Sequence, residues 1–171
     1  MRFERISIEQ FLRDFLYFGV SYKDLKLPKR ATRKSAGYDI YSPIDFELKP
    51  LQTINIPTGV KVNLDDDKCL MIFPRSGQGF KYKVQLYNTV GIIDADYYNN
   101  IKNDGHIWVK LYNDSPSGET LVVKAGDAIC QGVILPYFCV EDDEADAERT
   151  GGFGSTSNNS SDDSQMKFEG F

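Results

Sequence analysis

The chain has 171 residues, of which 41% are hydrophobic and 26% charged, and its formal net charge is −5 at pH 7. This size and balance are typical of one compact domain, and the acidic balance argues against wrapping a nucleic-acid backbone, which needs a basic face. No run approaches the roughly 20 apolar residues of a membrane span, and the N-terminus lacks the apolar stretch of a secretory signal. We therefore expect a soluble, cytoplasmic protein that binds neither nucleic acid nor membrane.

Residues 1–20 predict an amphipathic helical extension that docks on the body of the protein. Ser7 is suited to cap the start of a helix, and Gln10, three residues later, completes a capping box. The apolar stripe of this helix comprises Ile8, Phe11, Leu12, Phe15 and Leu16.

Residues 21–140 consist almost entirely of strand and turn patterns. QTINI and VKVNL flank the turn Pro57-Thr58-Gly59. In IWVKLY, the apolar residues Ile107, Val109 and Leu111 alternate with Trp108, Lys110 and Tyr112. These patterns predict an antiparallel barrel or sandwich.

Three cysteines, Cys69, Cys130 and Cys139, occur in apolar, strand-like runs. Their odd number and the lack of CxxC spacing favour buried thiols over disulfides or a zinc site.

The last part of the chain changes composition. Residues 141–148 are an acidic run that we expect to be solvated, and residues 157–171 are too polar to bury a core, which predicts a disordered tail. Between them, ERTGGFG combines Arg149 and Phe153 with flexible glycines. A plain Gly-Ser linker does not explain the arginine and the aromatic ring, so residues 141–156 are interpreted as an acidic linker and a closing arm.

Two glycine-containing stretches in the barrel could hold an anion or a metal. SAGYDIYS places Asp39 at the start of a strand, where its carboxylate could hold the water shell of a magnesium ion or serve only a turn.

FPRSGQGFK predicts a tight turn at Pro74 and Gly77 whose backbone N–H groups converge on an anion, with Arg75 and Ser76 as further donors. The spacing and the following helix of a P-loop are missing, and an ordinary hairpin turn is the alternative.

The stretch NTVGIIDADYYNNI predicts a protruding hairpin that carries the most chemistry. On a strand, Asp94 and Asp96 would share one face, but the carboxyl pair of a glycosidase approaches a bond from opposite sides, so that reading is disfavoured. We favour one aspartate that activates water, while Asn88 and the backbone beside Gly91 bind a flat ring.

The stretch KAGDAICQGVILPY leads a turn into a buried strand with one internal polar side chain, Gln131. Such a glutamine usually needs a hydrogen bond, and this bond can be structural or can serve a ligand.

Five stretches, AGYDIYS, PRSGQGFK, NTVGIIDADY, AGDAICQG and RTGGFGSTS, resemble the five motifs of the homotrimeric deoxyuridine triphosphatases (dUTPases), in family order over roughly residues 22–156. The resemblance implies an all-β, jelly-roll-like distorted β-barrel with a short N-terminal helix and a flexible C-terminal arm. It also implies a homotrimer whose active sites draw on all three subunits. The implied reaction is magnesium-dependent hydrolysis of dUTP to dUMP and pyrophosphate, which keeps uracil out of DNA and supplies dUMP for thymidylate synthesis.

The resemblance also implies roles for single residues. Asp94 would activate the attacking water, and Tyr97 would pack under the deoxyribose. The residues that would pair with uracil are Asn88 and, through their backbone, Gly91, Ile92 and Ile93.

The other implied roles concern the triphosphate. Its binding residues would be Arg75, Ser76 and Gly77, and the residues that would contact magnesium-bound waters are Asp39 and Gln131. Arg149 would meet the terminal phosphate, and Phe153 would cover the base.

This chain departs from the family pattern in three ways: the arm and one further segment differ in length, and the N-terminal helix and the polar tail beyond Thr156 fall outside the resemblance. The family arm reads Arg-Gly-x-Gly-Gly-Phe, whereas Thr150 here directly precedes two glycines, so the arm is one residue shorter. The segment IKNDGHIWV is longer than usual, which places Lys102 and His106 in an extra hairpin loop without an assigned role.

Two alternatives stay open. A dCTP deaminase on the same barrel would need a glutamate near the base, and IWVKLYN offers none. A regulatory protein could instead use the nucleotide only to switch its affinity for a partner through the N-terminal helix or the tail.

Overall fold

The structure is a computed structural model that describes residues 1–145. The predictions for Arg149, Phe153 and residues 157–171 lie outside the described residues. Within the described part, the helices are α1 (Ile8–Asp14) and α2 (Ser76–Tyr82), with 3-10 turns η1 (Tyr22–Asp24) and η2 (Ala95–Tyr97). The strands are β1 (Arg2–Arg5), β2 (Lys29–Arg30), β3 (Tyr38–Tyr41), β4 (Phe46–Leu48), β5 (Thr53–Pro57), β6 (Val60–Asn63), β7 (Lys68–Pro74), β8 (Val84–Leu86), β9 (Gly91–Ile93), β10 (Trp108–Asn113), β11 (Leu121–Val123) and β12 (Ala128–Pro136).

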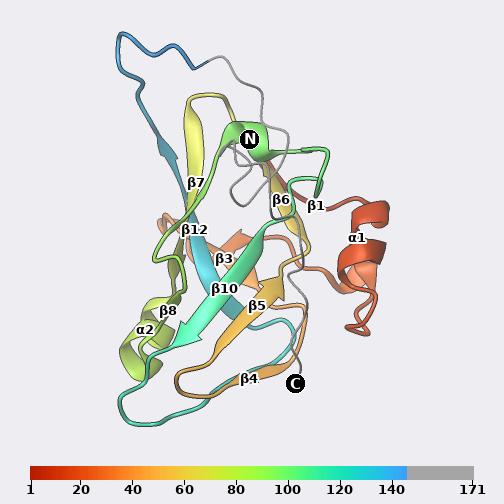
Figure 1. Cartoon of the computed structure of the whole chain (residues 1–171), viewed down its shortest axis with the longest axis vertical. Coiled ribbons are helices and arrows are strands. Elements are labelled where there is room, and N and C mark those ends of the chain that lie inside the picture. The colour runs from red at the N-terminus through yellow and green to blue at the C-terminus, as the bar shows by residue number, and fades with distance from the viewer. Residues whose placement is uncertain (146–171) are drawn as a thin grey trace, which may run out of the picture.

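The strands pair antiparallel in four sheets around one main core. The largest sheet has the order β2-β3-β12-β7-β9, a second has the order β5-β10-β8, and two pairs are β1-β6 and β11-β4. Figure 1 shows β12 and β10 crossing the middle of the molecule, with α1 on one flank and α2 near the other. The predicted all-β, jelly-roll-like barrel is confirmed.

The alternating pattern of β10 positions its residues as predicted. Val109 and Leu111 are buried together with Ile107, whereas Lys110 faces solvent. β12 is the longest strand and pairs with β3 on one side and β7 on the other, so it joins segments that are distant in sequence.

Ser7 caps α1, but the predicted capping box is wrong in its second half. The Ser7 hydroxyl accepts a hydrogen bond from the Gln10 backbone N–H at 3.2 Å, as expected. The Gln10 side chain donates to Asp14 instead of reaching back, and the Ser7 N–H donates to Asp104 at 2.6 Å. A carboxylate from a distant loop therefore replaces the local partner.

The apolar stripe predicted for the N-terminal helix docks on the protein only in part, so the prediction is wrong for three of its five residues. Phe11 and Phe15 are buried and stack on one another, whereas Ile8, Leu12 and Leu16 are exposed.

The strand β1 precedes this helix and pairs with β6, so the first residues of the chain are part of the β-barrel.

The prediction for the cysteines holds for two of the three. Cys69 and Cys130 are buried, but Cys139 is exposed, because β12 ends at Pro136 and the chain continues into solvent. Within residues 1–145, no helix is long and apolar enough to cross a membrane.

Candidate active site

The largest sheet brings three of the predicted motifs together. Asp39 on β3 lies opposite Gln131 on β12, and Gln131 lies opposite Phe73 on β7. Directly opposite residues in an antiparallel pair project to the same face of the sheet. The AGYDIYS, FPRSG and AICQG segments therefore form one continuous surface.

An ion pair joins the first two of these segments. Arg75 Nε lies 3.0 Å from Asp39 Oδ1, and Arg75 Nη2 lies 3.5 Å from Asp39 Oδ2. The Arg75 side chain is 41% exposed and that of Asp39 is 17% exposed. The guanidinium can therefore meet a ligand from solvent while it balances the charge of the more buried carboxylate.

Gln131 has the hydrogen bond that its position in an apolar strand requires. Its Nε2 donates to the Pro74 carbonyl at 3.1 Å, which ties β12 to the end of β7. A Cβ at Gly37 would lie 2.4 Å from Gln131 Oε1, so Gly37 makes room for this amide. The amide oxygen therefore occupies a space that only a glycine at position 37 leaves open.

The FPRSGQGFK segment forms a helix start, which corrects the prediction that no helix follows. Arg75 is the N-cap of α2, and the C-cap Lys83 has a left-handed φ of 51°. The first N–H groups of a helix have no intrahelical partner, so the predicted anion-binding N–H groups at Ser76 and Gly77 become those of a helix N-terminus. A shallow hollow of about 270 Å³ lies here, lined by Pro74, Arg75, Ser76, Gly79 and Phe80.

Gly77 has no structural constraint within the described part of the chain. Its φ is not in the left-handed region, and a Cβ built on it would meet nothing within 4 Å. A glycine that neither strain nor crowding demands is consistent with close approach of a ligand to its backbone.

The aspartates of NTVGIIDADY lie at the end of a strand and not along it. β9 ends at Ile93, Asp94 is the N-cap of η2, and Asp96 lies inside η2. The strand geometry considered for a carboxylate pair is therefore wrong, as is the hairpin, because β9 pairs with β7 and the chain leaves it through η2. The local reason is that the backbone turns at Asp94, whose carbonyl accepts from the Tyr97 N–H at 3.2 Å.

Tyr97 is held firmly beside Asp94. Its side chain is 7% exposed, its hydroxyl donates to the His106 carbonyl at 3.0 Å, and it accepts from Asn103 Nδ2 at 2.7 Å. The position of the ring is thus set by hydrogen bonds inside the protein. Its predicted contact with a sugar stays a prediction.

The predicted ring-binding residues lie on an edge of the largest sheet. Asn88 is exposed in the turn before β9, and its carbonyl accepts from the Val90 N–H at 2.8 Å. β9 pairs only with β7 among the described strands, which leaves the outer backbone edge of Gly91, Ile92 and Ile93 available to a ligand.

The two halves of the predicted site lie far apart in one chain. Ile93 pairs with Leu70, three residues along β7 from Phe73, which is in the row of Asp39 and Gln131. Three residues along a strand span about 10 Å, and the three strand spacings from β3 to β9 add about 14 Å across the sheet, so Ile93 lies about 17 Å from Asp39. Asp94 follows one residue further away.

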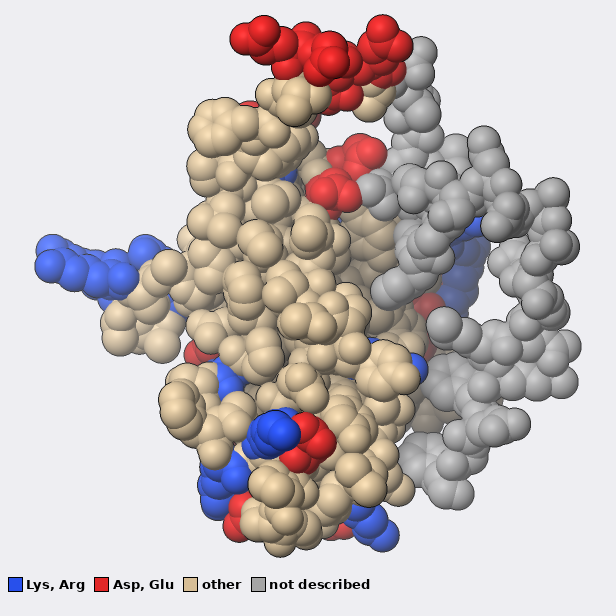
Figure 2. Space-filling view, turned by 60° about the vertical axis from the view of Figure 1, so that its left-hand side comes forward, with Lys and Arg blue, Asp and Glu red and all other residues tan. Residues whose placement is uncertain are grey.

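The charge distribution separates the same two ends. Figure 2 shows acidic side chains gathered at one end of the molecule, the end at which the chain leaves β12 in Figure 1. The acidic side chains of residues 141–144 follow β12 there. The opposite end of β12 adjoins Arg75, so a polyphosphate is electrostatically favoured at the Asp39 and Arg75 end.

The chain's one histidine is a structural residue. His106 is fully buried, its Nε2 accepts the Gly59 N–H at 2.8 Å, and its Nδ1 lies 2.5 Å from Asp14 Oδ2. This arrangement defines the neutral tautomer with the proton on Nδ1. Burial lowers the pKa of His106. The sequence places His106 in an extra hairpin loop without a role, and its burial depends on tertiary contacts with Gly59 and Asp14.

The donor set suits a magnesium ion held through water. No group of three or more His, Cys, Asp or Glu side chains converges among residues 1–145. Asp39 and Gln131 supply two oxygen-bearing side chains from adjacent strands, and Mg²⁺ prefers oxygen ligands and retains several waters. These residues therefore fit an ion that also binds substrate phosphates.

Comparisons with known proteins show the family to which the chain belongs. The dUTPase family model matches residues 23–157. The deoxyuridine 5'-triphosphate nucleotidohydrolase of Lactococcus lactis is 40% identical over 134 residues, covering 77% of this chain and 88% of the relative. The relative from Laribacter hongkongensis is 41% identical over 137 residues, covering 75% and 87% of the two chains.

Solved structures show the same fold. The dUTPase of Streptococcus mutans superposes with a TM-score of 0.67 at 34% identity, covering 82% of this chain and 99% of that one. A dUTPase from phage phi11 of S. aureus is similar in fold, with a TM-score of 0.62 at 22% identity, and covers 85% and 96%. The chain is a β-barrel protein of the nucleotide-hydrolase kind, and it belongs to the dUTPase family.

Proposed function

We propose that this dUTPase hydrolyses dUTP to dUMP and pyrophosphate in active sites that are shared between the subunits of a homotrimer. The sharing of active sites between subunits is supported by the distance between Asp94 and Asp39 in one chain. The strand spacings put this distance at about 17 Å or more. A base must be within hydrogen-bond reach of the water that it activates, directly or through one further water. Asp94 and the phosphate-binding residues of the same chain therefore serve different nucleotides.

In this reaction Asp94 acts as the general base. It takes a proton from a water molecule as the water oxygen forms a bond to the α-phosphorus. The bond from that phosphorus to the bridging oxygen breaks, and pyrophosphate leaves. Negative charge builds on the phosphoryl oxygens, and Arg75 with the N–H groups of Ser76 and Gly77 stabilises it more in the transition state than in the ground state.

Asp39 and Gln131 would hold the waters of a magnesium ion. When bound, the ion would neutralise phosphate charge. The Asp39–Arg75 ion pair supports this role, because it holds the carboxylate in one orientation beside Gln131. A phage phi11 dUTPase variant, similar in fold with a TM-score of 0.61 at 20% identity, coordinates a structural Mg(II) ion.

The uracil would bind at the open edge of β9. Asn88 and the backbone of Gly91, Ile92 and Ile93 supply donors and acceptors in fixed positions, and Tyr97 would pack under the deoxyribose. Arg149 and Phe153, outside the described residues, would complete the site as the arm. In the cell this activity would keep uracil out of DNA and supply dUMP for thymidylate synthesis.

The test is to measure pyrophosphate release from dUTP, UTP, dTTP and dCTP by the wild type and by Asp94→Asn. We expect a clear preference for dUTP, and kcat lower by about 100-fold or more in the variant, as for loss of a general base. Asp96→Asn is the matched control, because it removes a neighbouring carboxylate of η2. Equal rates on all four nucleotides, or an equal loss of activity in both variants, would contradict the proposal.

A further inference from the structure

The phosphate-binding surface has one more charged neighbour, Lys29. In the short β2-β3 ladder, Lys29 lies opposite Asp39, and Asp39 lies opposite Gln131 in the next ladder. Directly opposite residues project to the same face with Cβ atoms about 4.5–5.5 Å apart. Lys29, Asp39 and Gln131 thus form one row across three strands.

Lys29 and Arg75 lie on opposite sides of this row. Arg75 approaches Asp39 from the β7 side, where it forms the ion pair, whereas Lys29 lies on the outer strand β2. Two cations therefore border the carboxylate and amide that would hold the waters of a magnesium ion. A triphosphate bound over the row would meet positive charge from both sides.

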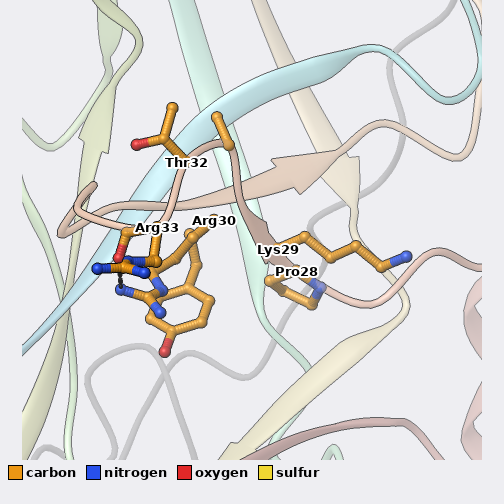
Figure 3. Close-up of a pocket in the computed structure, with 7 residues that line it drawn as sticks. Pro28, Lys29, Arg30, Thr32 and Arg33 are labelled. Atoms are coloured by element: carbon orange, nitrogen blue, oxygen red, sulfur yellow. Dashed lines mark hydrogen bonds between the residues drawn. The ribbon is translucent and has the colours of Figure 1, made fainter.

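The side chain of Lys29 is directed away from the other cations of its hairpin. Figure 3 shows Lys29 extending to one side and Arg30 with Arg33 on the other. Arg30 packs over the Tyr38 ring, with its guanidinium carbon 5.9 Å from the ring centroid, and donates a hydrogen bond to the Arg33 carbonyl at 3.1 Å. Lys29 is exposed, and no ion pair to it is present among residues 1–145.

We propose that Lys29 is a phosphate-binding residue for the β- and γ-phosphates of dUTP and for the pyrophosphate product. This inference rests on the proposed function, since it assigns a further binding residue to that same site. Lys29 lies across the row from Ser76 and Gly77. With the α-phosphate at the N–H groups of those two residues, as proposed above, Lys29 would meet the phosphates beyond it. An exposed lysine on an edge strand can also serve only to prevent edge-to-edge aggregation, and the two roles predict different measurements.

The experiment compares Lys29→Gln, Lys29→Arg and Lys34→Gln with the wild type. Lys34 is the matched control, because it is an exposed lysine of the same hairpin and its loss changes the net charge equally. The probes are a non-hydrolysable imido analogue of dUTP, inorganic pyrophosphate and dUMP, each titrated by calorimetry with magnesium present. Size-exclusion chromatography reports aggregation.

Loss of one charge-assisted hydrogen bond should raise the Kd of Lys29→Gln for the analogue and for pyrophosphate by about 10-fold to 100-fold. The Kd for dUMP should stay within about twofold, Lys29→Arg should recover most of the affinity, and Lys34→Gln should match the wild type. Equal effects of Lys29→Gln and Lys34→Gln, an equal loss for dUMP, or aggregation with unchanged affinity would overturn the inference. A wild type without dUTP hydrolysis would instead sink the proposed function.

Discussion

Gly132 in β12 and Gly37, just before β3, make room for different neighbours, and their substitution should separate activity from stability. A Cβ at Gly132 would lie 2.7 Å from Leu70 Cδ1 in the core, whereas a Cβ at Gly37 would meet the end of the Gln131 side chain at 2.4 Å. Overpacking a core typically costs about 1–3 kcal/mol. The end of a flexible side chain moves more easily, but then Gln131 leaves its place beside Asp39.

We expect Gly132→Ala to lower the free energy of unfolding by about 1–3 kcal/mol. Gly37→Ala should change it by less than about 1 kcal/mol but should lower kcat/KM for dUTP by about 10-fold to 100-fold, as for a displaced site residue. Urea unfolding and steady-state kinetics of both variants provide the measurement. A Gly37→Ala variant with wild-type kcat/KM would show that the position of Gln131 has no part in the reaction.

The sequence predicts the role of a single residue best where that role depends only on residue type and on near neighbours in the sequence. Ser7 caps its helix as its residue type suggests, and Ile107, Val109 and Leu111 are buried as their spacing requires. The role of Gln10 was not predictable, because its partner Asp14 and the competing carboxylate of Asp104 depend on tertiary structure.

At the scale of elements, the sequence predicts strands with alternating patterns and misses short elements that depend on distant partners. β10 and α1 follow from the periodicity of their apolar residues. β1, in contrast, forms because it pairs with β6, a strand that is far away in sequence: Arg2 lies opposite Asn63, and Arg5 lies opposite Val60. α2 contains two glycines and therefore resembles a turn; its C-terminal end is set by Lys83 in the left-handed conformation. η2 replaces the expected hairpin because the chain turns at Asp94.

His106 joins α1 to the barrel and should make this contact sensitive to acid. It holds Gly59 through Nε2 and Asp14 of α1 through Nδ1, and protonation of Nε2 would place two donors face to face. Burial lowers the pKa of His106 below 6.5, while Asp14 and Asp104 oppose that shift. In mild acid the unfolded chain therefore binds a proton at His106 that the folded chain excludes. The contribution of neutral His106 to the free energy of unfolding is fully present above pH 6.5 and is lost as the pH falls from there toward the folded-state pKa.

The expected loss is up to about 1.4 kcal/mol per pH unit as the pH falls below about 6.5 toward the lowered folded-state pKa. Thermal unfolding of the wild type and His106→Gln over this range provides the measurement. The variant should be less stable at neutral pH and should lose this pH dependence. Parallel curves for the two proteins would assign the acid sensitivity to other groups.

At the scale of the whole molecule, the motifs predict which residues take part but not that one chain divides them between two places. AGYDIYS, FPRSG and AICQG meet on adjacent strands because β12 pairs with both β3 and β7. Asp94 lies beyond the far end of β9, and motif order carries no information on that distance. Exposed apolar residues at this end, Ile92, Phe138 and Val140, are consistent with a contact to another subunit.

Subunit sharing predicts that two inactive variants restore activity when they are mixed. Asp94→Asn damages only the base, and Arg75→Ala damages only the phosphate-binding surface. If each site takes these two residues from different subunits, random mixing in equal amounts leaves both intact in one half times one half of the sites, so about a quarter of wild-type activity should return. The measurement is dUTP hydrolysis after the two variants are unfolded together and refolded, with each variant refolded alone as the control. If both residues acted within one chain, every chain in the mixture would carry a damaged site, and the activity would stay at the average of the two variants.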